Sequence, residues 1–375
     1  MKPLKLALIR QRYTPFGGAE RFVARAMQAL QAQGTTVTIV TRQWDTTAPD
    51  AALICNPFYF GSLWRDWGFA RGVCRTLAQH PFDLVQSHER IACCDIYRAG
   101  DGVHREWLTQ RARVLNPLQR LGVALNPYHR YVLAAEKKLF ASPQLKAVIC
   151  NSRMVKEEIM RHFQVPQEKL HVIYSGVDLE TFHPRLKETH RLSVRAQFGI
   201  PSDATLFLFV GSGFERKGLA ALLRAFAQLP PAAQLAVVGH DRHAQHYQRL
   251  ATQLGIAKRV HFLGPQADVK PYYGAAGALA LPTLYDPFPN AALEALACGL
   301  PVITSTKSGA AELIRANENG FVCDALDKQA LTQALRALLN GHAENLASAA
   351  RATVTALSLE AMAGQLGALY HTLSY

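Results

Sequence analysis

Hydrophobic positions in the first half of this chain form short continuous runs that alternate with longer stretches of helical periodicity. Buried strands are predicted by the aliphatic and β-branched runs at 4–9, 37–41, 84–87 and 147–150. Helices are predicted by the amphipathic patterns at 19–33, 63–79, 128–140 and 152–163. Strands that alternate with helices in this way are typical of a parallel sheet covered by helices on both faces.

The same alternation begins again after a connector near 176–188. Strands are predicted at 206–210, 235–238, 260–263, 278–281 and 302–304, and helices at 219–228, 244–254, 268–275, 291–298 and 310–315. Further helices at 328–339, 343–357 and 359–373 complete the pattern. It predicts an α/β protein with two Rossmann-like parallel-sheet domains, at 1–176 and 177–357, followed by a helix at 358–375.

Composition is that of a globular protein rather than a disordered or membrane-spanning one. The chain has 375 residues, of which 49% are hydrophobic and 18% are charged. No apolar run reaches the ~18–20 residues that a membrane-spanning helix needs. The apolar start of the chain is broken at Gln11-Arg12, so it predicts a buried strand rather than a signal peptide. Seven cysteines without metal-site spacing fit a reducing cytosol, with the adjacent Cys93 and Cys94 as packing residues.

Positive charge is concentrated in the first half. The formal net charge is +13, and residues 1–180 hold 24 Lys and Arg against 15 Asp and Glu. This half is therefore expected to face an anionic partner. A phosphorylated glycolipid or an anionic membrane surface fits better than nucleic acid, because the sequence contains no recognised nucleic-acid-binding module.

Two carboxylates stand at the junction after the strand predicted at 278–281. Asp286 lies in the predicted loop, and Glu294 lies about one turn into the next helix. Asn290 is predicted to cap that helix, and Gly299 to end it. The free N–H groups of a first helical turn attract phosphate, while a carboxylate one turn in can accept paired hydroxyls. The junction therefore predicts a site for a sugar, a diphosphate and a ribose.

This run, Asp286-Pro-Phe-Pro-Asn-Ala-Ala-Leu-Glu294, resembles the donor signature of retaining GT-B glycosyltransferases of family 4. The family has two Glu residues at this spacing, and here Asp286 replaces the first. The resemblance implies that Glu294 holds the ribose hydroxyls of a nucleotide sugar and that Asp286 contacts the transferred sugar. Phe288, Pro289 and Asn290, between the two acids, are expected to select that sugar. The alternative is an ordinary strand–helix unit with solvated acids.

A cationic turn follows the strand predicted at 206–210. Gly211-Ser-Gly-Phe-Glu-Arg216-Lys217-Gly218 resembles the Arg-Lys-Gly segment of the same family. A guanidinium binds two phosphate oxygens, and an ammonium supplies a point charge. Because a leaving nucleoside diphosphate gains negative charge in the transition state, Arg216 and Lys217 are expected both to bind the donor and to catalyse. A solvated basic turn is the alternative.

A glycine pair precedes the helix predicted at 19–33. Gly17 and Gly18 let a phosphate or a sugar approach the start of that helix, and they resemble the opening glycine loop of the family. The Gly-x-Gly-x-x-Gly pattern of nicotinamide-binding domains is absent after this strand.

Two further candidates follow predicted strand ends of the first half. His88, in Gln86-Ser-His-Glu89, resembles the family histidine that lines the sugar pocket. Asp101, between two glycines, resembles an acceptor-side Asp of the lipopolysaccharide core glucosyltransferases that add the first glucose to heptose. Both are expected to orient and polarise the reactants. A structural histidine and a turn without a catalytic role are the alternatives.

Residues 104–138 combine basic and apolar side chains. The basic ones are Arg105, Arg111, Arg113, Arg120, Arg130, Lys137 and Lys138. Such a segment suits a membrane interface or a phosphorylated saccharide, and the alternative is an insertion whose apolar face belongs to the core.

No Asp-x-Asp triplet occurs in the sequence, although metal-dependent nucleotide-sugar enzymes commonly hold their cation with such a pair. Arg216, Lys217 and a helix N-terminus are expected to hold the diphosphate instead, with no metal and no other cofactor.

The resemblance extends from residue 4 to about residue 321. It implies the GT-B fold, in which two Rossmann-like domains face each other across a cleft and the last helix crosses back to the first. It further implies metal-independent transfer of glucose, with retention, from UDP-glucose to a heptose of the lipopolysaccharide inner core. The expected partners are a UDP-sugar, a heptosylated lipid A core and an anionic membrane surface, at the cytosolic face of a Gram-negative inner membrane. Three alternatives remain: another UDP-hexose or UDP-N-acetylhexosamine used on a different envelope glycan, a silent sugar-binding or membrane-scaffold protein, and an RNA binder.

Overall fold

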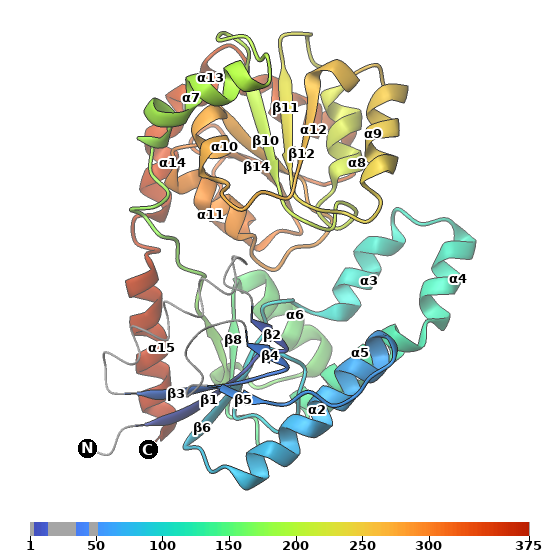
Figure 1. The fold of residues 1–375 in the computed structure, drawn as a ribbon, viewed down its shortest axis with the longest axis vertical. Helices are drawn as coiled ribbons and strands as arrows, with labels where there is room; N and C mark the ends of the chain where they lie inside the picture. The colour runs from blue at the N-terminus through green and yellow to red at the C-terminus, as the bar shows by residue number, and fades with distance from the viewer. Residues whose placement is uncertain (1–3, 14–34, 45–51, 375) are drawn as a thin grey trace. The chain divides into compact units, whose positions relative to one another are not determined.

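The computed structural model describes residues 4–13, 35–44 and 52–374, and the chain divides into two compact units (Figure 1). Unit 1 comprises Met1–Ser175 and Leu359–Tyr375, and unit 2 comprises Gly176–Ser358. Each unit contains one large parallel sheet. The predicted α/β class with two Rossmann-like sheets is therefore confirmed. The helix predicted at 19–33 lies outside the described residues.

The sheet of unit 1 has the strand order β5-β3-β1-β6-β7-β8-β9. Its strands are β1 (Lys5–Ile9), β3 (Thr36–Thr41), β5 (Ala52–Ile54), β6 (Leu84–Ser87), β7 (Ile96–Arg98), β8 (Ala147–Cys150) and β9 (Leu170–Val172). Two short strands, β2 (Arg12–Tyr13) and β4 (Gln43–Trp44), pair with each other. The hydrophobic pattern predicts β1, β3, β6 and β8 but misses β5, β7 and β9, because three residues are too few to show a period.

The helices of unit 1 are α2 (Gly61–Gln79), α3 (His104–Ala112), α4 (Pro117–Leu125), α5 (Pro127–Phe140), α6 (Arg153–Phe163) and α15 (Leu359–Ser374), with a 3₁₀ turn, η2 (Gln167–Lys169). Asn116 begins α4 with a capping box, and Pro117 follows at the first helical position. Asn126 caps α5 and Ser152 caps α6 by accepting backbone N–H groups.

Side chains of β1 alternate between the two faces of this sheet. Leu6 and Leu8 pack in one core cluster, and Ala7 and Ile9 pack in the other. The first of these clusters includes side chains of α15: Met362, Leu366, Leu369 and Tyr370. The second includes side chains of α2, α5 and α6: Phe69, Val73, Leu139, Val155 and Ile159. The C-terminal helix therefore covers a face of the unit 1 sheet.

Unit 2 has the strand order β12-β11-β10-β13-β14-β15. Its strands are β10 (Leu206–Val210), β11 (Gln234–Val238), β12 (Val260–Gly264), β13 (Ala278–Leu281), β14 (Val302–Ser305) and β15 (Gly320–Cys323). Its helices are α7 (Leu186–Gln197), α8 (Leu219–Phe226), α9 (Ala244–Gln253), α10 (Lys270–Ala275), α11 (Asn290–Ala297), α12 (Lys328–Ala337), α13 (His342–Asn345) and α14 (Ala347–Val354), with 3₁₀ turns η3 (Ala257–Arg259) and η4 (Gly309–Leu313). Continuous apolar runs such as β13 are buried along their whole length.

Two helix predictions in unit 2 need correction, and one helix was not predicted. The segment predicted as a helix at 310–315 forms the 3₁₀ turn η4. The helix predicted at 343–357 is two helices, α13 and α14. Helix α7 begins inside the predicted connector and buries only Val194 and Arg195.

The prediction of reduced, unpaired cysteines is wrong at one pair. A disulfide joins Cys74 of α2 to Cys93 in the segment after β6. Folding brings these residues together across a sequence separation of 19, which the sequence pattern alone does not reveal. Cys94 is buried as a packing residue, as expected.

None of the helices in the described part of the chain is long and apolar enough to cross a membrane.

Candidate functional site

The cationic turn of unit 2 lies at the carboxyl end of β10. Gly218 has φ +77°, and a Cβ there would stand 1.9 Å from the Pro282 carbonyl oxygen, so only glycine permits this approach. The close approach is fixed by two hydrogen bonds, because the Leu284 N–H and the Thr283 hydroxyl both donate to the Arg216 carbonyl at 2.8 Å. The turn and the loop after β13 therefore form one rigid structure.

Both predicted cations of this turn point into that loop. Arg216 donates through Nε to the Tyr285 carbonyl at 2.9 Å, and its guanidinium lies 5.8 Å from the centre of the Tyr285 ring. The Lys217 ammonium forms an ion pair with the Asp286 carboxylate. Asp286 is buried, so this pair sits where water screens charge poorly. The solvated-turn alternative does not describe these contacts.

The loop that carries Asp286 is unusual because every residue from 282 to 289 is buried. The Asp286 N–H donates to the Lys307 carbonyl and its carbonyl accepts from the Gly309 N–H, both at 2.9 Å. These bonds tie the ends of β13 and β14 together at the carboxyl edge of the sheet, where parallel sheets bind ligands.

Glu294 lies on the accessible face of α11. Asn290, Ala291 and Glu294 are partly exposed, while Ala292, Leu293 and Ala295 are buried. Positions i and i+4 share a helix face, so Asn290 and Glu294 are adjacent on it. Phe288 and Pro289 are buried just before the helix. The predicted N-cap is wrong by one residue: α11 begins at Asn290, Pro289 is the capping residue, and no side chain caps the helix.

Tyr273 is a further candidate residue of the site, which sequence reasoning missed. Its hydroxyl donates to Glu294 Oε2 at 2.7 Å, and the residue is almost completely buried. Burial, together with the Glu294 carboxylate, raises the pKa of Tyr273 well above its usual range, so the hydroxyl stays a donor. Glu294 is thereby held in one orientation. The only sequence signal was the pair of tyrosines in α10.

Ser308 is a second missed residue. It forms an isolated bridge with Asp286, and it is 1% exposed. Its hydroxyl has no hydrogen-bond partner within the described parts of the chain. Because an unsatisfied buried hydroxyl is costly, Ser308 is a further candidate for donor contact.

His88 of unit 1 lies at the carboxyl end of β6. It is 9% exposed, and its Nε2 lies 3.1 Å from Gln86 Nε2. Burial, with help from the nearby Arg98 and Arg10 guanidinium groups, holds the pKa of His88 well below its usual range. The imidazole is therefore neutral at physiological pH and can polarise a hydroxyl without carrying charge.

Asp101 lies in the turn after β7, the neighbour of β6, so both candidates of unit 1 occupy the same edge of the sheet. Its side chain is 57% exposed, and its Oδ2 lies 3.6 Å from Arg90 Nη1. Arg90 also donates to Glu136 at 2.9 Å, and the same Glu136 oxygen accepts the His104 N–H at the start of α3. This buried ion pair fixes the turn while leaving the Asp101 carboxylate accessible. Gly17 and Gly18 lie outside the described residues.

Comparison with known proteins identifies the family to which this chain belongs. Residues 16–181 match the family described as Glycosyltransferase Family 4, and residues 191–353 match the family described as Glycosyl transferases group 1. The fold matches a crystal structure of WaaG, a glycosyltransferase involved in lipopolysaccharide biosynthesis, with a TM-score of 0.83 and 25% identity over 97% of this chain and 99% of that one. The chain is a GT-B glycosyltransferase.

Relatives of this glycosyltransferase differ in what their names say they act on. The lipopolysaccharide glucosyltransferase WaaG of Escherichia coli is 27% identical over 341 residues, which is 89% of each chain. A D-inositol 3-phosphate glycosyltransferase of Xylanimonas cellulosilytica is 28% identical over 373 residues, 90% of this chain and 87% of the relative. A crystal structure of Anabaena HepE with UDP-glucose has a TM-score of 0.74 at 20% identity, covering 98% of this chain and 100% of that one, which shows a shared fold.

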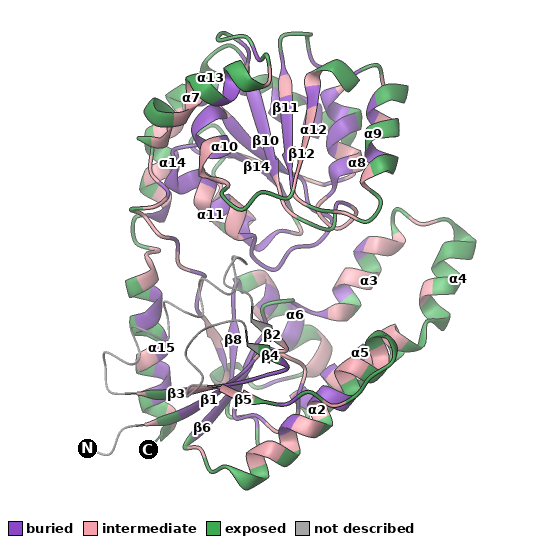
Figure 2. Ribbon diagram, viewed as in Figure 1, coloured by how far each residue is buried: buried purple, intermediate pink, exposed green. Residues whose placement is uncertain are grey.

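The basic segment of the glycosyltransferase, 104–138, is only partly core. Helix α4 contains no buried residue, whereas α5 buries Val132, Glu136 and Leu139 (Figure 2). The interpretation of this segment as a core insertion therefore holds for α5 and is wrong for α4.

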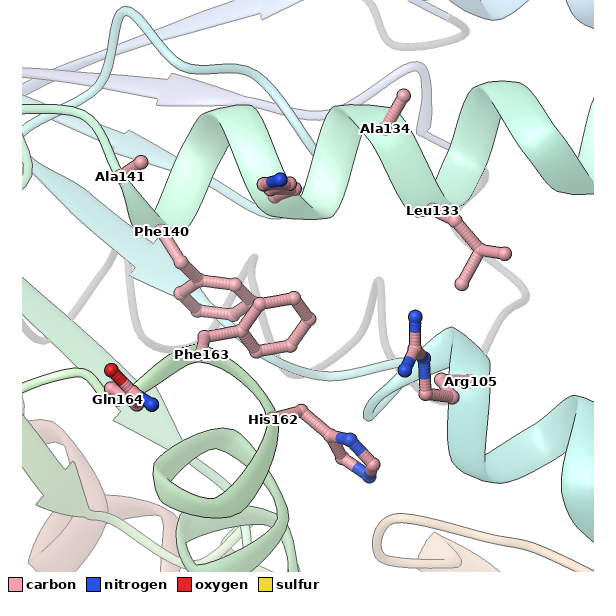
Figure 3. A pocket seen from close by; sticks show the side chains of 9 residues that line it. Arg105, Leu133, Ala134, Phe140, Ala141, His162, Phe163 and Gln164 are labelled. Atoms are coloured by element: carbon pink, nitrogen blue, oxygen red, sulfur yellow. The ribbon is translucent and has the colours of Figure 1, made fainter.

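A pocket of about 510 Å³ lies among α3, α5 and α6 of the glycosyltransferase. Figure 3 shows Arg105 and His162 beside it, with the Phe140 and Phe163 rings packed together at one end. Those ring centres are 4.4 Å apart. His162 Nε2 is 2.7 Å from Glu106. Arg105 and Lys137 also line the pocket, so it combines apolar rings with basic side chains. Such a lining suits an anionic group attached to an apolar body.

Proposed function

We propose that this glycosyltransferase transfers glucose from UDP-glucose to a heptose of the lipopolysaccharide inner core, with retention of anomeric configuration. The observation that carries the proposal is the likeness to WaaG over 89% of the chain, whose name states both the sugar and the glycan. Unit 2 supports a nucleotide-sugar donor independently, because it brings Arg216, Lys217 and Glu294 to the carboxyl edge of one sheet.

Each donor residue has a role that its contacts support. Arg216 and Lys217 supply positive charge for the diphosphate, which becomes more negative as the sugar leaves. Glu294, oriented by Tyr273, accepts hydrogen bonds from the ribose hydroxyls. Asp286 contacts the transferred sugar from the buried loop, with Phe288, Pro289 and Asn290 completing its wall.

The anomeric configuration is proposed to be retained because the acceptor hydroxyl attacks the sugar on the same face that the diphosphate leaves. The acceptor hydroxyl gives its proton to the departing phosphate. Asp101 and the neutral imidazole of His88 orient and polarise the reacting groups. No covalent intermediate with the protein is required. The proposal also requires no metal ion, because Arg216 and Lys217 provide the charge that a cation would supply.

A second acceptor is favoured by a specific observation. The D-inositol 3-phosphate glycosyltransferase relative is as similar in sequence as WaaG, at 28% against 27% identity. A phosphorylated polyol is therefore the second candidate acceptor. Another UDP-hexose or UDP-N-acetylhexosamine is the second candidate donor, and Phe288, Pro289 and Asn290 are the residues expected to decide between them.

The test is UDP release measured in EDTA with UDP-glucose, UDP-galactose and UDP-N-acetylglucosamine. Each donor is combined with heptose-terminated lipid A core, with D-inositol 3-phosphate, or with no acceptor. We expect release from UDP-glucose that depends on the heptose acceptor and persists in EDTA. Release only with inositol phosphate reassigns the acceptor, and release only after adding a divalent cation refutes metal independence. Binding of UDP without turnover on any acceptor would favour the silent sugar-binding protein.

We also propose that the enzyme works at an anionic membrane surface, the cytosolic face of a Gram-negative inner membrane. Neutralising Arg111, Arg113 and Arg120 to Gln is expected to weaken binding to anionic vesicles about tenfold, since each basic side chain near such a surface contributes about 1 kcal/mol and some of that is screened. UDP affinity is expected to be unchanged. Vesicle sedimentation and UDP titration measure the two effects.

The matched control replaces three exposed arginines of unit 2, Arg242, Arg249 and Arg336, and removes the same charge. Equal losses of vesicle binding in both triple variants would show that net charge, rather than the α3–α4 segment, governs association.

A further inference from the structure

Exposed large hydrophobic side chains gather in two segments of unit 1. Helix α4 and the residues before it expose Val114, Leu118, Leu121 and Leu125. The second segment, between β5 and the first turns of α2, exposes Ile54, Phe58, Tyr59, Phe60, Trp64 and Trp67. Phe58 and Phe60 are 83% and 81% exposed. Large apolar side chains that are exposed together on one surface mark a site of interaction with a membrane or another protein. We call Phe58, Phe60, Trp64 and Trp67 the aromatic patch.

The aromatic patch is held by a rigid anchor rather than displayed on a loose loop. Arg42 is 4% exposed and donates to the Asn56 side chain and the Pro57 carbonyl, both at 2.8 Å. Its other nitrogen donates to the Arg65 carbonyl at 3.2 Å, which ties the segment to α2. The Phe58 and Trp64 rings pack edge to face with centres 6.3 Å apart. The Phe58 ring is therefore packed against Trp64 although it is largely exposed.

The exposed charged side chains of residues 52–79 and 104–138, which include the aromatic patch, are all positive. The acids within 52–79 and 104–138 are Asp66, Glu106 and Glu136, and none of them is exposed. Asp66 accepts the Tyr128 hydroxyl at 2.9 Å, which joins the start of α2 to the start of α5. The exposed charged side chains in these ranges are all basic: Arg71, Arg75, Arg105, Arg113, Arg120, Arg130, Lys137 and Lys138.

A groove continues from the aromatic patch between α2 and α5. It has a volume of about 590 Å³, and Trp67 lines it together with small apolar residues of both helices. Arg71, Arg75 and Lys138 also line it. An apolar floor with a basic rim matches an acyl chain attached to an anionic headgroup.

We propose that the aromatic patch is a membrane anchor that inserts into the boundary between headgroups and acyl chains of an anionic bilayer. Phe and Trp rings favour that depth, and the surrounding basic side chains favour anionic headgroups. The proposal rests on the association with an anionic membrane proposed above. It assigns bilayer insertion to the aromatic patch, which lies outside the 104–138 segment.

The test compares the wild-type enzyme with the double variant Phe58→Ser, Phe60→Ser. Vesicles contain equal parts of phosphatidylcholine and phosphatidylglycerol, and a second set contains phosphatidylcholine alone. We expect about tenfold weaker binding to the mixed vesicles, because two largely exposed rings lose their apolar transfer. Leu192→Ser in unit 2, at a side chain that is 76% exposed, is the matched control and should bind as the wild type does.

Insertion into the bilayer is tested separately, in protein that keeps Phe58 and Phe60. Lipids brominated on the upper acyl chain should quench tryptophan fluorescence of the wild type. The variant Trp64→Phe, Trp67→Phe, which keeps Trp44 and Trp107, should lose most of that quenching. Unchanged vesicle affinity of the Phe58, Phe60 double variant overturns the proposal. So does a change in self-association with no change in lipid binding, measured by sedimentation, because the patch would then join two copies of the chain. UDP titration separates a failure of this proposal from a failure of the proposed function. If the wild type does not bind UDP, the proposed function is contradicted, while the vesicle comparison still tests the aromatic patch.

A different observation links the C-terminal helix to His88. The Tyr370 hydroxyl of α15 donates to Gln86 Oε1 at 2.6 Å, and Gln86 Nε2 lies 3.1 Å from His88 Nε2. Tyr370 and Gln86 are each 2% exposed. The Gln86 carbonyl is thus turned toward Tyr370, and its amide N–H groups are turned toward His88.

We infer that Tyr370 and Gln86 are positioning residues that hold His88 in a single tautomer. Gln86 donates to Nε2, so the ring proton sits on Nδ1, which then becomes the donor toward a substrate oxygen. The inference rests on the role proposed for His88 in glucosyl transfer. It explains why a helix at the end of the chain packs on the first sheet beside a candidate catalytic residue.

Nitrogen-15 NMR of the imidazole reports the tautomer directly, with His88→Asn to assign the signal. We expect a protonated Nδ1 and an unprotonated Nε2 in the wild type, and a mixture of tautomers in Tyr370→Phe, which keeps the ring but frees the Gln86 amide. We also expect about tenfold lower kcat in Tyr370→Phe at unchanged UDP affinity. Tyr247→Phe, at a buried tyrosine of unit 2, is the control. A wild-type signal with the proton on Nε2, or an unchanged signal in Tyr370→Phe, overturns the inference even if turnover falls.

Discussion

Replacing Lys217 by Ala is expected to lower kcat about 10²–10³-fold while weakening UDP affinity much less, because its ammonium interacts most strongly with the charge that develops on the leaving diphosphate. The side chain is 19% exposed and lies beside the buried Asp286. In such a poorly hydrated position a fixed cation stabilises an anion more than it would in water. Single-turnover kinetics with UDP-glucose and a UDP titration separate the two effects.

Lys258→Ala is the control for this prediction, because Lys258 is an exposed lysine of the same unit. Loss of Lys217 also leaves the buried Asp286 carboxylate without its cation, so the melting temperature of the variant needs to be measured. Adding Asp286→Asn to Lys217→Ala removes that orphaned charge. If both variants keep kcat but bind UDP poorly, Lys217 acts in ground-state binding and the transition-state role is wrong.

Replacing Glu294 by Ala is expected to weaken UDP binding by at least about 100-fold. A carboxylate that accepts two ribose hydroxyls makes two charge-assisted hydrogen bonds, each contributing about 1.5–3 kcal/mol. The accessible position of Glu294 on α11 and its orientation by Tyr273 support this role. Calorimetric titration with UDP and with uracil checks it, since uracil lacks the ribose and should not respond to the substitution.

Glu188→Ala, at an exposed position of α7, is the matched control. Tyr273→Phe should weaken UDP binding less than Glu294→Ala, because it removes the orienting hydrogen bond and leaves the carboxylate in place. UDP affinity that is unchanged in Glu294→Ala would refute the ribose role and remove a main support for the donor site in unit 2.

The secondary structure shows where sequence patterns are informative. Strands such as β10 and β13 were predicted because both faces of a parallel strand are covered, so their apolar residues are continuous. Strands β5, β7 and β9 were missed, since each has only three residues, and β15 was missed because only its first residue is buried. The start of α11 was misplaced by one residue, because Asn290 has the composition of a cap but Pro289 occupies that position.

The candidate site divides in a similar way. Arg216, Lys217 and Glu294 were predicted as donor-site residues from their residue types and from their resemblance to the motifs of the family. The residues that orient them were not, because Tyr273 reaches Glu294 across 21 positions and Gly218 matters only through its contact with Pro282. Tyr370 and Gln86 are 284 positions apart, and nothing in the sequence couples them.

The sequence by itself determined the α/β class, the two-sheet organisation and the positions of the ionisable groups expected at the donor site. These features are local, because hydrophobic period, glycine content and charge are properties of short segments. Only the tertiary structure decided the ion pair of Lys217 with Asp286, the Cys74–Cys93 disulfide and the solvent exposure of α4 and the aromatic patch. Each depends on which distant segments pack together, since burial and pairing are set by long-range contacts whose partners a one-dimensional pattern does not specify.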